Sequence, residues 1–159
     1  MTARGFAHFF RSLFDDDVWI EIGKAVAYAI PVAMALSIFY QWYPPALLYL
    51  SGTPDSATLA DVFAHAFAAA GIAGFVYAMV KKHKVGPLFM RRHVMLTVVV
   101  ITAVLIIPIW EYVEQLLRFV AIDDYKKDIV SDFSGIFAYI GLEALRRRLR
   151  NRKTGKSTK

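Results

Sequence analysis

The stretch LTVVVITAVLIIPIW, residues 96–110, has no charged side chain and decides the fold class. An uncharged apolar run approaching about 20 residues predicts a helix that crosses a membrane, because lipid favours apolar side chains on every face. The chain then continues as EYVEQLLRF, which places Glu111 and Glu114 where the sequence is still largely apolar. The stretch therefore predicts a membrane-spanning helix with two carboxylates near one end.

The composition of the whole chain favours a membrane protein over a soluble domain. Of its 159 residues, 57% are apolar, and the mean hydropathy is +0.44. A single soluble domain of this length would expose much of that apolar surface to water. The chain has no cysteine, which excludes disulfides and thiolate metal sites. Helix packing must therefore hold the fold together.

Four apolar stretches, separated by charged segments, predict four membrane spans. They are expected at residues 25–43, 58–80, 94–118 and 128–145. Such lengths roughly match a hydrocarbon core of about 30 Å at about 1.5 Å rise per residue. Before them, the segment GFAHFFRSLF, residues 5–14, is typical of a short interfacial helix. The predicted fold class is all-α, an integral membrane four-helix bundle with a short N-terminal interfacial helix.

The chain divides into three predicted segments. Residues 1–24 form an N-terminal cytoplasmic and interfacial segment, residues 25–145 the transmembrane domain, and residues 146–159 a basic tail. The tail has no acid and accounts for the net charge of +6 with eight basic residues: Arg146, Arg147, Arg148, Arg150, Arg152, Lys153, Lys156 and Lys159. We expect it to be disordered and to bind anionic lipid, and we expect no nucleic-acid partner.

The remaining basic residues predict the orientation in the membrane. The N-terminal segment and the connection between the second and third spans are rich in Lys and Arg, whereas the connection between the first and second spans has neither. Between the third and fourth spans, the positive charges of Arg118, Lys126 and Lys127 are offset by two aspartates. Because positively charged connections stay in the cytoplasm, both termini are expected to be cytoplasmic.

This topology brings six ionisable side chains to the outer half of the membrane. They form three pairs, one on each of three helices: Asp61 and His65, Glu111 and Glu114, and Asp128 and Asp132. The members of each pair are three or four residues apart and share a helix face. Ionisable groups at this depth usually face the bundle interior or a water-filled cavity and are candidates for function. The set predicts a pocket that opens outward.

A structural interpretation of the same acids is also available. Asp61 and Asp128 fall in the first turn of their helices, where a carboxylate is favoured by the helix dipole by about 0.3–1 kcal/mol. Glu114 precedes Arg118 by four residues, the spacing of an ordinary helical ion pair. Each acid alone is explained in this way, whereas three pairs on matched faces favour a functional pocket.

The chemistry of the pocket suits a divalent cation. Carboxylates and one imidazole are ligands for Mg²⁺, Mn²⁺, Fe²⁺ or Zn²⁺, and the predicted metal ligands are His65, Glu111, Glu114 and Asp132. Clustered carboxylates cannot all stay ionised without compensation. A bound cation, protonation of some acids, or pairing with His65 and Arg118 would each supply it, and the sequence leaves these alternatives open.

Small residues predict where helices approach closely. Gly71 and Gly74 lie in the second span, and Gly135 and Gly141 lie in the fourth. In membranes, glycines let the backbones of two helices pack against each other.

Three motifs resemble the VanZ-like family of small bacterial membrane proteins. DVFAHAFAAAGIAG, beginning at Asp61, resembles the family's span in which a histidine follows an aspartate by four residues. EYVE and DIVSDFSG resemble the later motifs, in which an acid precedes glutamine by three residues and DI-x-x-N-x-x-G follows. Here Glu114 replaces that glutamine and Asp132 replaces the asparagine, as in the related YjdF-type proteins. The resemblance covers residues 58–142.

The resemblance implies a four- or five-helix protein of the bacterial inner membrane, in a family associated with susceptibility to the glycopeptide teicoplanin. It brings no settled mechanism, so two classes of function stay open. In the first, the six ionisable residues form a catalytic pocket that acts on the headgroup of a lipid or cell-wall precursor. In the second, the protein is not an enzyme: it binds a cationic ligand or relays protons, and the acids are structural.

Overall fold

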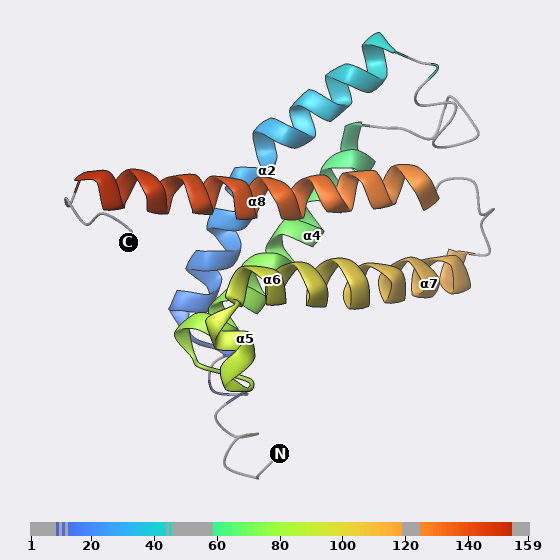
Figure 1. Cartoon of the computed structure of the whole chain (residues 1–159). Helices are drawn as coiled ribbons and strands as arrows, with labels where there is room; N and C mark the ends of the chain where they lie inside the picture. Colours follow the sequence, from blue (N-terminus) through green and yellow to red (C-terminus); the bar gives the residue numbers. More distant parts are fainter. Residues whose placement is uncertain are drawn as a thin grey trace.

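The computed structural model describes residues 9, 11, 13–43, 45, 59–118 and 125–153. All regular elements in these residues are helices, which confirms the predicted all-α class. In chain order they are α2 (Asp16–Trp42), α4 (Leu59–Tyr77), η1 (Ala78–Lys82), α5 (Leu88–Arg92), α6 (Val94–Val99), η2 (Val100–Ile106), α7 (Ile107–Arg118) and α8 (Tyr125–Lys153) (Figure 1).

Helix α2 begins earlier than the predicted first span. Asp15 is its N-cap, and the Asp15 side chain accepts a hydrogen bond from the backbone N–H of Asp17. Acidic residues in the first turn also suit the positive end of the helix dipole. Part of the predicted N-terminal segment is therefore the first turns of α2. The predicted interfacial helix at residues 5–14 lies largely outside the described residues.

Two helices in the described part are long and apolar enough, by length and composition, to cross a membrane. They are Asp16–Trp42 and Asp61–Lys82, the second of which combines α4 with the π-helix η1. The stretch Val94–Trp110 is a shorter apolar helix. Two of the four predicted spans thus coincide with helices that are long and apolar enough to cross a membrane.

The third apolar stretch is helical throughout, and its irregularity precedes Pro108. Residues Val100–Ile106 form the π-helix η2, and the N–H of Ile107 bonds to the carbonyl of Thr102, five residues back. Proline lacks an N–H and its ring crowds the carbonyl four residues earlier, so a regular α-helix is strained at this point. The wider turn of a π-helix relieves that crowding one turn before the proline.

Helix α4 is the centre of the molecule. It packs against α2 on one side and α8 on another, and α2 also contacts α8. Figure 1 shows α2 and α4 running steeply, in opposite directions, while α7 and α8 lie across them. In this view the described helices run in two crossing directions.

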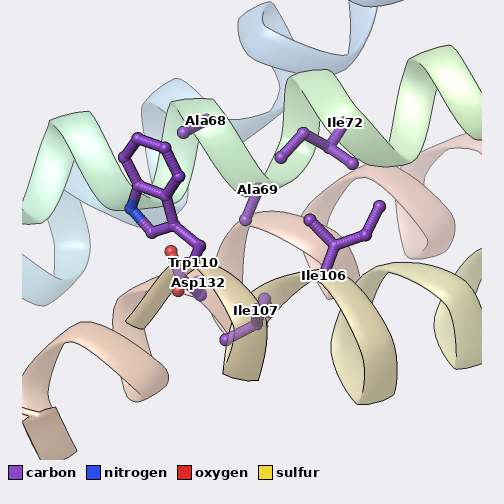
Figure 2. A pocket seen from close by; sticks show the side chains of 7 residues that line it. All are labelled: Ala68, Ala69, Ile72, Ile106, Ile107, Trp110 and Asp132. Carbon is purple, nitrogen blue, oxygen red and sulfur yellow. The ribbon is translucent and has the colours of Figure 1, made fainter. Parts of the chain in front are cut away.

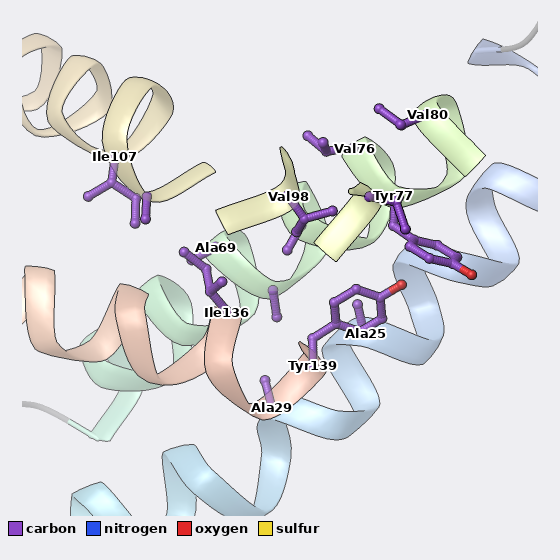
Figure 3. Close-up of a cluster of buried hydrophobic side chains, with 14 residues drawn as sticks. Ala25, Ala29, Ala69, Val76, Tyr77, Val80, Val98, Ile107, Ile136 and Tyr139 are labelled. Atoms are coloured by element: carbon purple, nitrogen blue, oxygen red, sulfur yellow. The ribbon is translucent and has the colours of Figure 1, made fainter. Parts of the chain in front are cut away.

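Small side chains allow these helices to approach closely (Figure 3). The buried cluster between α2, α4 and α8 includes Ala25, Ala29 and Ala69 together with the larger Ile136 and Tyr139. Such a core fills narrow spaces between helix backbones with methyl groups and keeps bulky groups for the wider gaps.

Two of the four glycines predicted to permit close packing do so. A Cβ at Gly135 would overlap the carbonyl group of Ala66, and a Cβ at Gly74 would lie 2.9 Å from the carbonyl oxygen of Glu21. At Gly71 the nearest side chains lie at an ordinary 3.6 Å. The prediction is wrong for Gly141, where an added Cβ would meet nothing within 4 Å.

The basic residues that follow residue 145 are not a disordered tail as far as the structure describes them. Helix α8 continues to Lys153. The reason is local: Glu143 is 1% exposed and pairs with Arg146 and Arg147, three and four residues further along the same face. These ion pairs favour helix past the predicted end of the fourth span.

Candidate functional site

The contact between α4 and α8 builds the site. Because Gly135 has no side chain, the backbone of α8 reaches the carbonyl of Ala66 on α4. His65 precedes Ala66, and Asp132 lies one turn before Gly135. The close approach therefore carries the imidazole of one helix into contact with the carboxylates of the other.

His65 lies among three aspartates. Its Nδ1 is 3.3 Å from Asp132 Oδ1, and its Nε2 is 3.6 Å from Asp128 Oδ1 and 3.9 Å from Asp61 Oδ1. His65 is 6% exposed, and both α8 aspartates are buried as well. The structure thus confirms an acidic and histidine cluster, made by four of the six residues predicted from the sequence.

Lys127 completes the cluster and was not expected there. Its side chain is 0% exposed, and its ammonium pairs with Asp61 Oδ2 and lies 3.6 Å from Asp128 Oδ1. The sequence analysis placed Lys127 in the connection between spans. Helix α8 begins at Tyr125, however, so Lys127 belongs to its first turn and shares a face with Ser131, which donates a hydrogen bond to the Lys127 carbonyl.

Lys127 changes the charge balance of the site. Three carboxylates face one ammonium and one imidazole. The Arg118 side chain lies outside the described part of the chain. With His65 protonated, the cluster carries a net charge of −1, and with His65 neutral it carries −2. The site therefore keeps an excess of negative charge that favours a cation.

The structure describes the backbone of Glu111 and Glu114 in α7 but not their side chains. The predicted metal ligand set of His65, Glu111, Glu114 and Asp132 is therefore only partly described. A different set of three residues is spaced so that it could hold a metal ion. One ligand atom each from Asp61, His65 and Asp128 lies within 4.8 Å of the others, while Asp132 contacts the opposite nitrogen of the imidazole.

An apolar pocket of about 100 Å³ adjoins this cluster (Figure 2). Its walls come from α4, α8 and the η2–α7 helix: Ala68, Ala69, Ile72, Ile106, Ile107, Trp110 and Asp132. Asp132 supplies the charged group in this wall. In Figure 2 its carboxylate lies at the same end of the pocket as the Trp110 indole. One carboxylate thus belongs both to the buried cluster and to the pocket.

A second polar cluster, further along α8, joins that helix to α2. Glu21 of α2 accepts a hydrogen bond of 2.8 Å from the Tyr139 hydroxyl, and Lys24 lies 3.1 Å from Glu143 of α8. Glu143 also accepts bonds from two arginines of α8, and the bond from Arg146 raises the pKa of that guanidinium. The sequence analysis missed this cluster, because its members are far apart in the chain.

Comparisons with protein-family models, with curated proteins and with solved structures give no match to this chain. Function is therefore inferred from the chemistry of the two buried clusters and the pocket.

Proposed function

We propose that this chain is a VanZ-like, multi-pass protein of the bacterial inner membrane, with four spans, cytoplasmic termini and the His65 cluster in the outer half of the bilayer. Large exposed apolar side chains support contact with lipid, because a soluble protein rarely exposes so many. They include, on α2, Ile30, Met34, Ile38, Phe39 and Trp42, and, on η2 and α7, Val104, Leu105, Ile109, Trp110, Tyr112 and Leu116.

The protein binds the headgroup of an envelope lipid or of a lipid-linked cell-wall precursor. The observation that carries this proposal is the position of Asp132, whose carboxylate contacts His65 and also borders an otherwise apolar pocket. Amphiphiles have the same juxtaposition of polar and apolar groups. A pocket of about 100 Å³ is smaller than the roughly 300–1,000 Å³ of complete small-ligand sites. It holds a short part of the ligand's chain, and the rest lies along the membrane surface of α7.

The charge of the cluster selects the headgroup. Three carboxylates around one imidazole and one ammonium disfavour an exposed phosphate and favour a group that donates hydrogen bonds or carries positive charge. The ammonium of an ethanolamine headgroup has both properties. His65, whose ring is held by Asp132, is also an acid–base group within reach of such a donor, so proton transfer is the chemistry available if the headgroup is transformed.

Lipid retention tests this proposal. The protein is reconstituted in nanodiscs with equal parts phosphatidylethanolamine and phosphatidylglycerol, and lipids retained after gentle detergent extraction are counted by native mass spectrometry. We expect the wild type to retain phosphatidylethanolamine preferentially. Asp132→Asn should lose that preference, because the amide has no charge to attract the ammonium.

Matched variants separate the pocket from the general surface of α4. Ala68 and Ala64 are both exposed on this helix, one turn apart, and only Ala68 lines the pocket. Ala68→Phe should fill the pocket and reduce retention, whereas Ala64→Phe should keep it. Equal retention of the two lipids by the wild type, or equal effects of both phenylalanines, would contradict the proposal.

A further inference from the structure

We propose that Asp61, His65 and Asp128 form a divalent-cation site in which the Lys127 ammonium acts as a built-in cation that a metal ion displaces. The inference deepens the proposed function by assigning a cofactor class to the same cluster. The metal site is tested by metal binding alone. The metal proposal can therefore fail while the lipid-binding proposal stands, and the lipid-binding proposal can fail while the metal proposal stands.

The ligand atoms already converge. His65 Nε2 lies 3.6 Å from Asp128 Oδ1 and 3.9 Å from Asp61 Oδ1, and one ligand atom from each residue lies within 4.8 Å of the other two. Ligands at about 2.0–2.2 Å from a common ion are separated by roughly 3–4 Å, so this spacing needs little adjustment. One imidazole and two carboxylates suit Zn²⁺ or Mn²⁺.

Asp132 provides the support that a metal-binding histidine usually has. A histidine that ligates a metal through one ring nitrogen commonly donates the N–H of the other to a carboxylate, which fixes the ring and raises its basicity. Asp132 Oδ1 lies 3.3 Å from His65 Nδ1, whereas Asp61 and Asp128 face the other ring nitrogen, Nε2. This leaves Nε2 as the nitrogen that faces the proposed ion.

The Tyr40 hydroxyl is a second observation that fits a ligand near this cluster. Tyr40 is 4% exposed and packs against Val62, which follows Asp61 on α4. Its hydroxyl oxygen is buried and has no hydrogen-bond partner among the described residues, although it is close enough to Lys127 and Asp128 to interact with both electrostatically. A buried hydroxyl usually has a partner, and an ion or its bound water at the cluster would supply one.

Lys127 occupies the place where a cation is needed. Its ammonium pairs with Asp61 Oδ2 and lies 3.6 Å from Asp128 Oδ1, the two carboxylates of the proposed ligand set. With neutral His65, the single ammonium leaves the three carboxylates with a net charge of −2, whereas a divalent ion in its place would lower the excess to −1. Because both cations use the same carboxylates, binding of the metal must compete with Lys127, and the wild-type affinity should be modest.

Removing the built-in cation is the decisive experiment. Wild type, Lys127→Met and Lys126→Met are purified in detergent after treatment with chelator, and Zn²⁺ binding is measured by isothermal titration calorimetry. We expect Lys127→Met to bind one Zn²⁺ per chain at least about tenfold more tightly than the wild type, because two carboxylates lose their competing partner. Lys126 is exposed, and Lys126→Met should resemble the wild type.

Second variants identify the ligands. Adding His65→Ala to Lys127→Met should abolish binding, and adding Asp132→Asn should weaken it by roughly 10–100-fold, as is typical of groups that support a ligand. If Lys127→Met is too unstable for calorimetry, Zn²⁺ should raise its melting temperature and leave that of the wild type nearly unchanged. Absence of both Zn²⁺ binding and stabilisation in Lys127→Met, or binding that survives His65→Ala, would overturn the proposal.

Discussion

Lys127 shows how strongly one residue controls the candidate site. A buried ammonium is stable only when it is paired, and the same holds for the carboxylates that face it. Lys127 contacts Asp61 and Asp128, and these two aspartates in turn face His65 Nε2. A substitution of Lys127 therefore changes the electrostatic environment of Asp61, Asp128 and His65.

Without added metal, Lys127→Met should destabilise the protein by roughly 3–5 kcal/mol, because it leaves two carboxylates without their buried partner. The double variant Lys127→Met with Asp61→Asn should recover part of that loss, since it removes one of the two charges. Thermal unfolding in detergent measures both. The Asp61→Asn single variant is measured in the same way. If the losses of stability in the two single variants simply add up in the double variant, the ion pair between Lys127 and Asp61 does not stabilise the protein.

At the scale of elements, the contact between α4 and α8 determines which side chains meet. Gly135 allows the two backbones to touch at Ala66, and this contact sets the register between His65 and Asp132. Gly141 lies on the same helix but faces open space. The two glycines are therefore a matched pair for testing the helix interface.

Gly135→Ala should destabilise the protein by about 1–3 kcal/mol or more, because the new methyl group overlaps the Ala66 carbonyl and the helices must separate. Gly141→Ala should be neutral or stabilising by up to about 1 kcal/mol, the usual gain for this substitution within a helix. Melting temperatures of both variants in the same detergent test the difference. Tolerance of alanine at both positions would mean that α4 and α8 do not touch at Gly135.

The sequence could predict where helices lie and which residues share one face of a helix. It could not predict which helices contact each other. A spacing of four residues placed Asp61 with His65 and Asp128 with Asp132, and in the structure all three aspartates lie around His65. Lys127 escaped prediction because the start of α8 could not be located to within one turn. The second cluster, in which Tyr139 meets Glu21, depends on how distant helices cross, and no periodicity along one helix contains that information.

At the scale of the whole molecule, two polar clusters hold α2, α4 and α8 at opposite ends. Near the start of α2, Glu21 and Lys24 meet Tyr139 and Glu143 of α8. Near the end of α2, Tyr40 lies close to Lys127 and Asp128. In the proposed topology the cluster of Glu21 and Glu143 faces the cytoplasm, and the His65 cluster faces the outer leaflet. The orientation of the chain therefore determines which cluster can meet lipids or precursors outside the cell.

Cysteine accessibility tests that orientation, because the chain has no native cysteine. Single cysteines are introduced at Ser56 and Asp123, in the two connections predicted to be external, and at Lys84, in the basic connection predicted to be cytoplasmic. On intact cells, or spheroplasts where an outer membrane blocks the reagent, an impermeant thiol reagent should label the first two and spare Lys84→Cys. Lysis should make Lys84→Cys reactive, which controls for expression.

The physical reason for this expectation is charge. The positive-inside preference opposes movement of the Lys- and Arg-rich connection and both terminal segments across the membrane. Labelling of Lys84→Cys alone on intact cells would reverse the topology, place His65 and its aspartates toward the cytoplasm, and require a ligand from the inner leaflet.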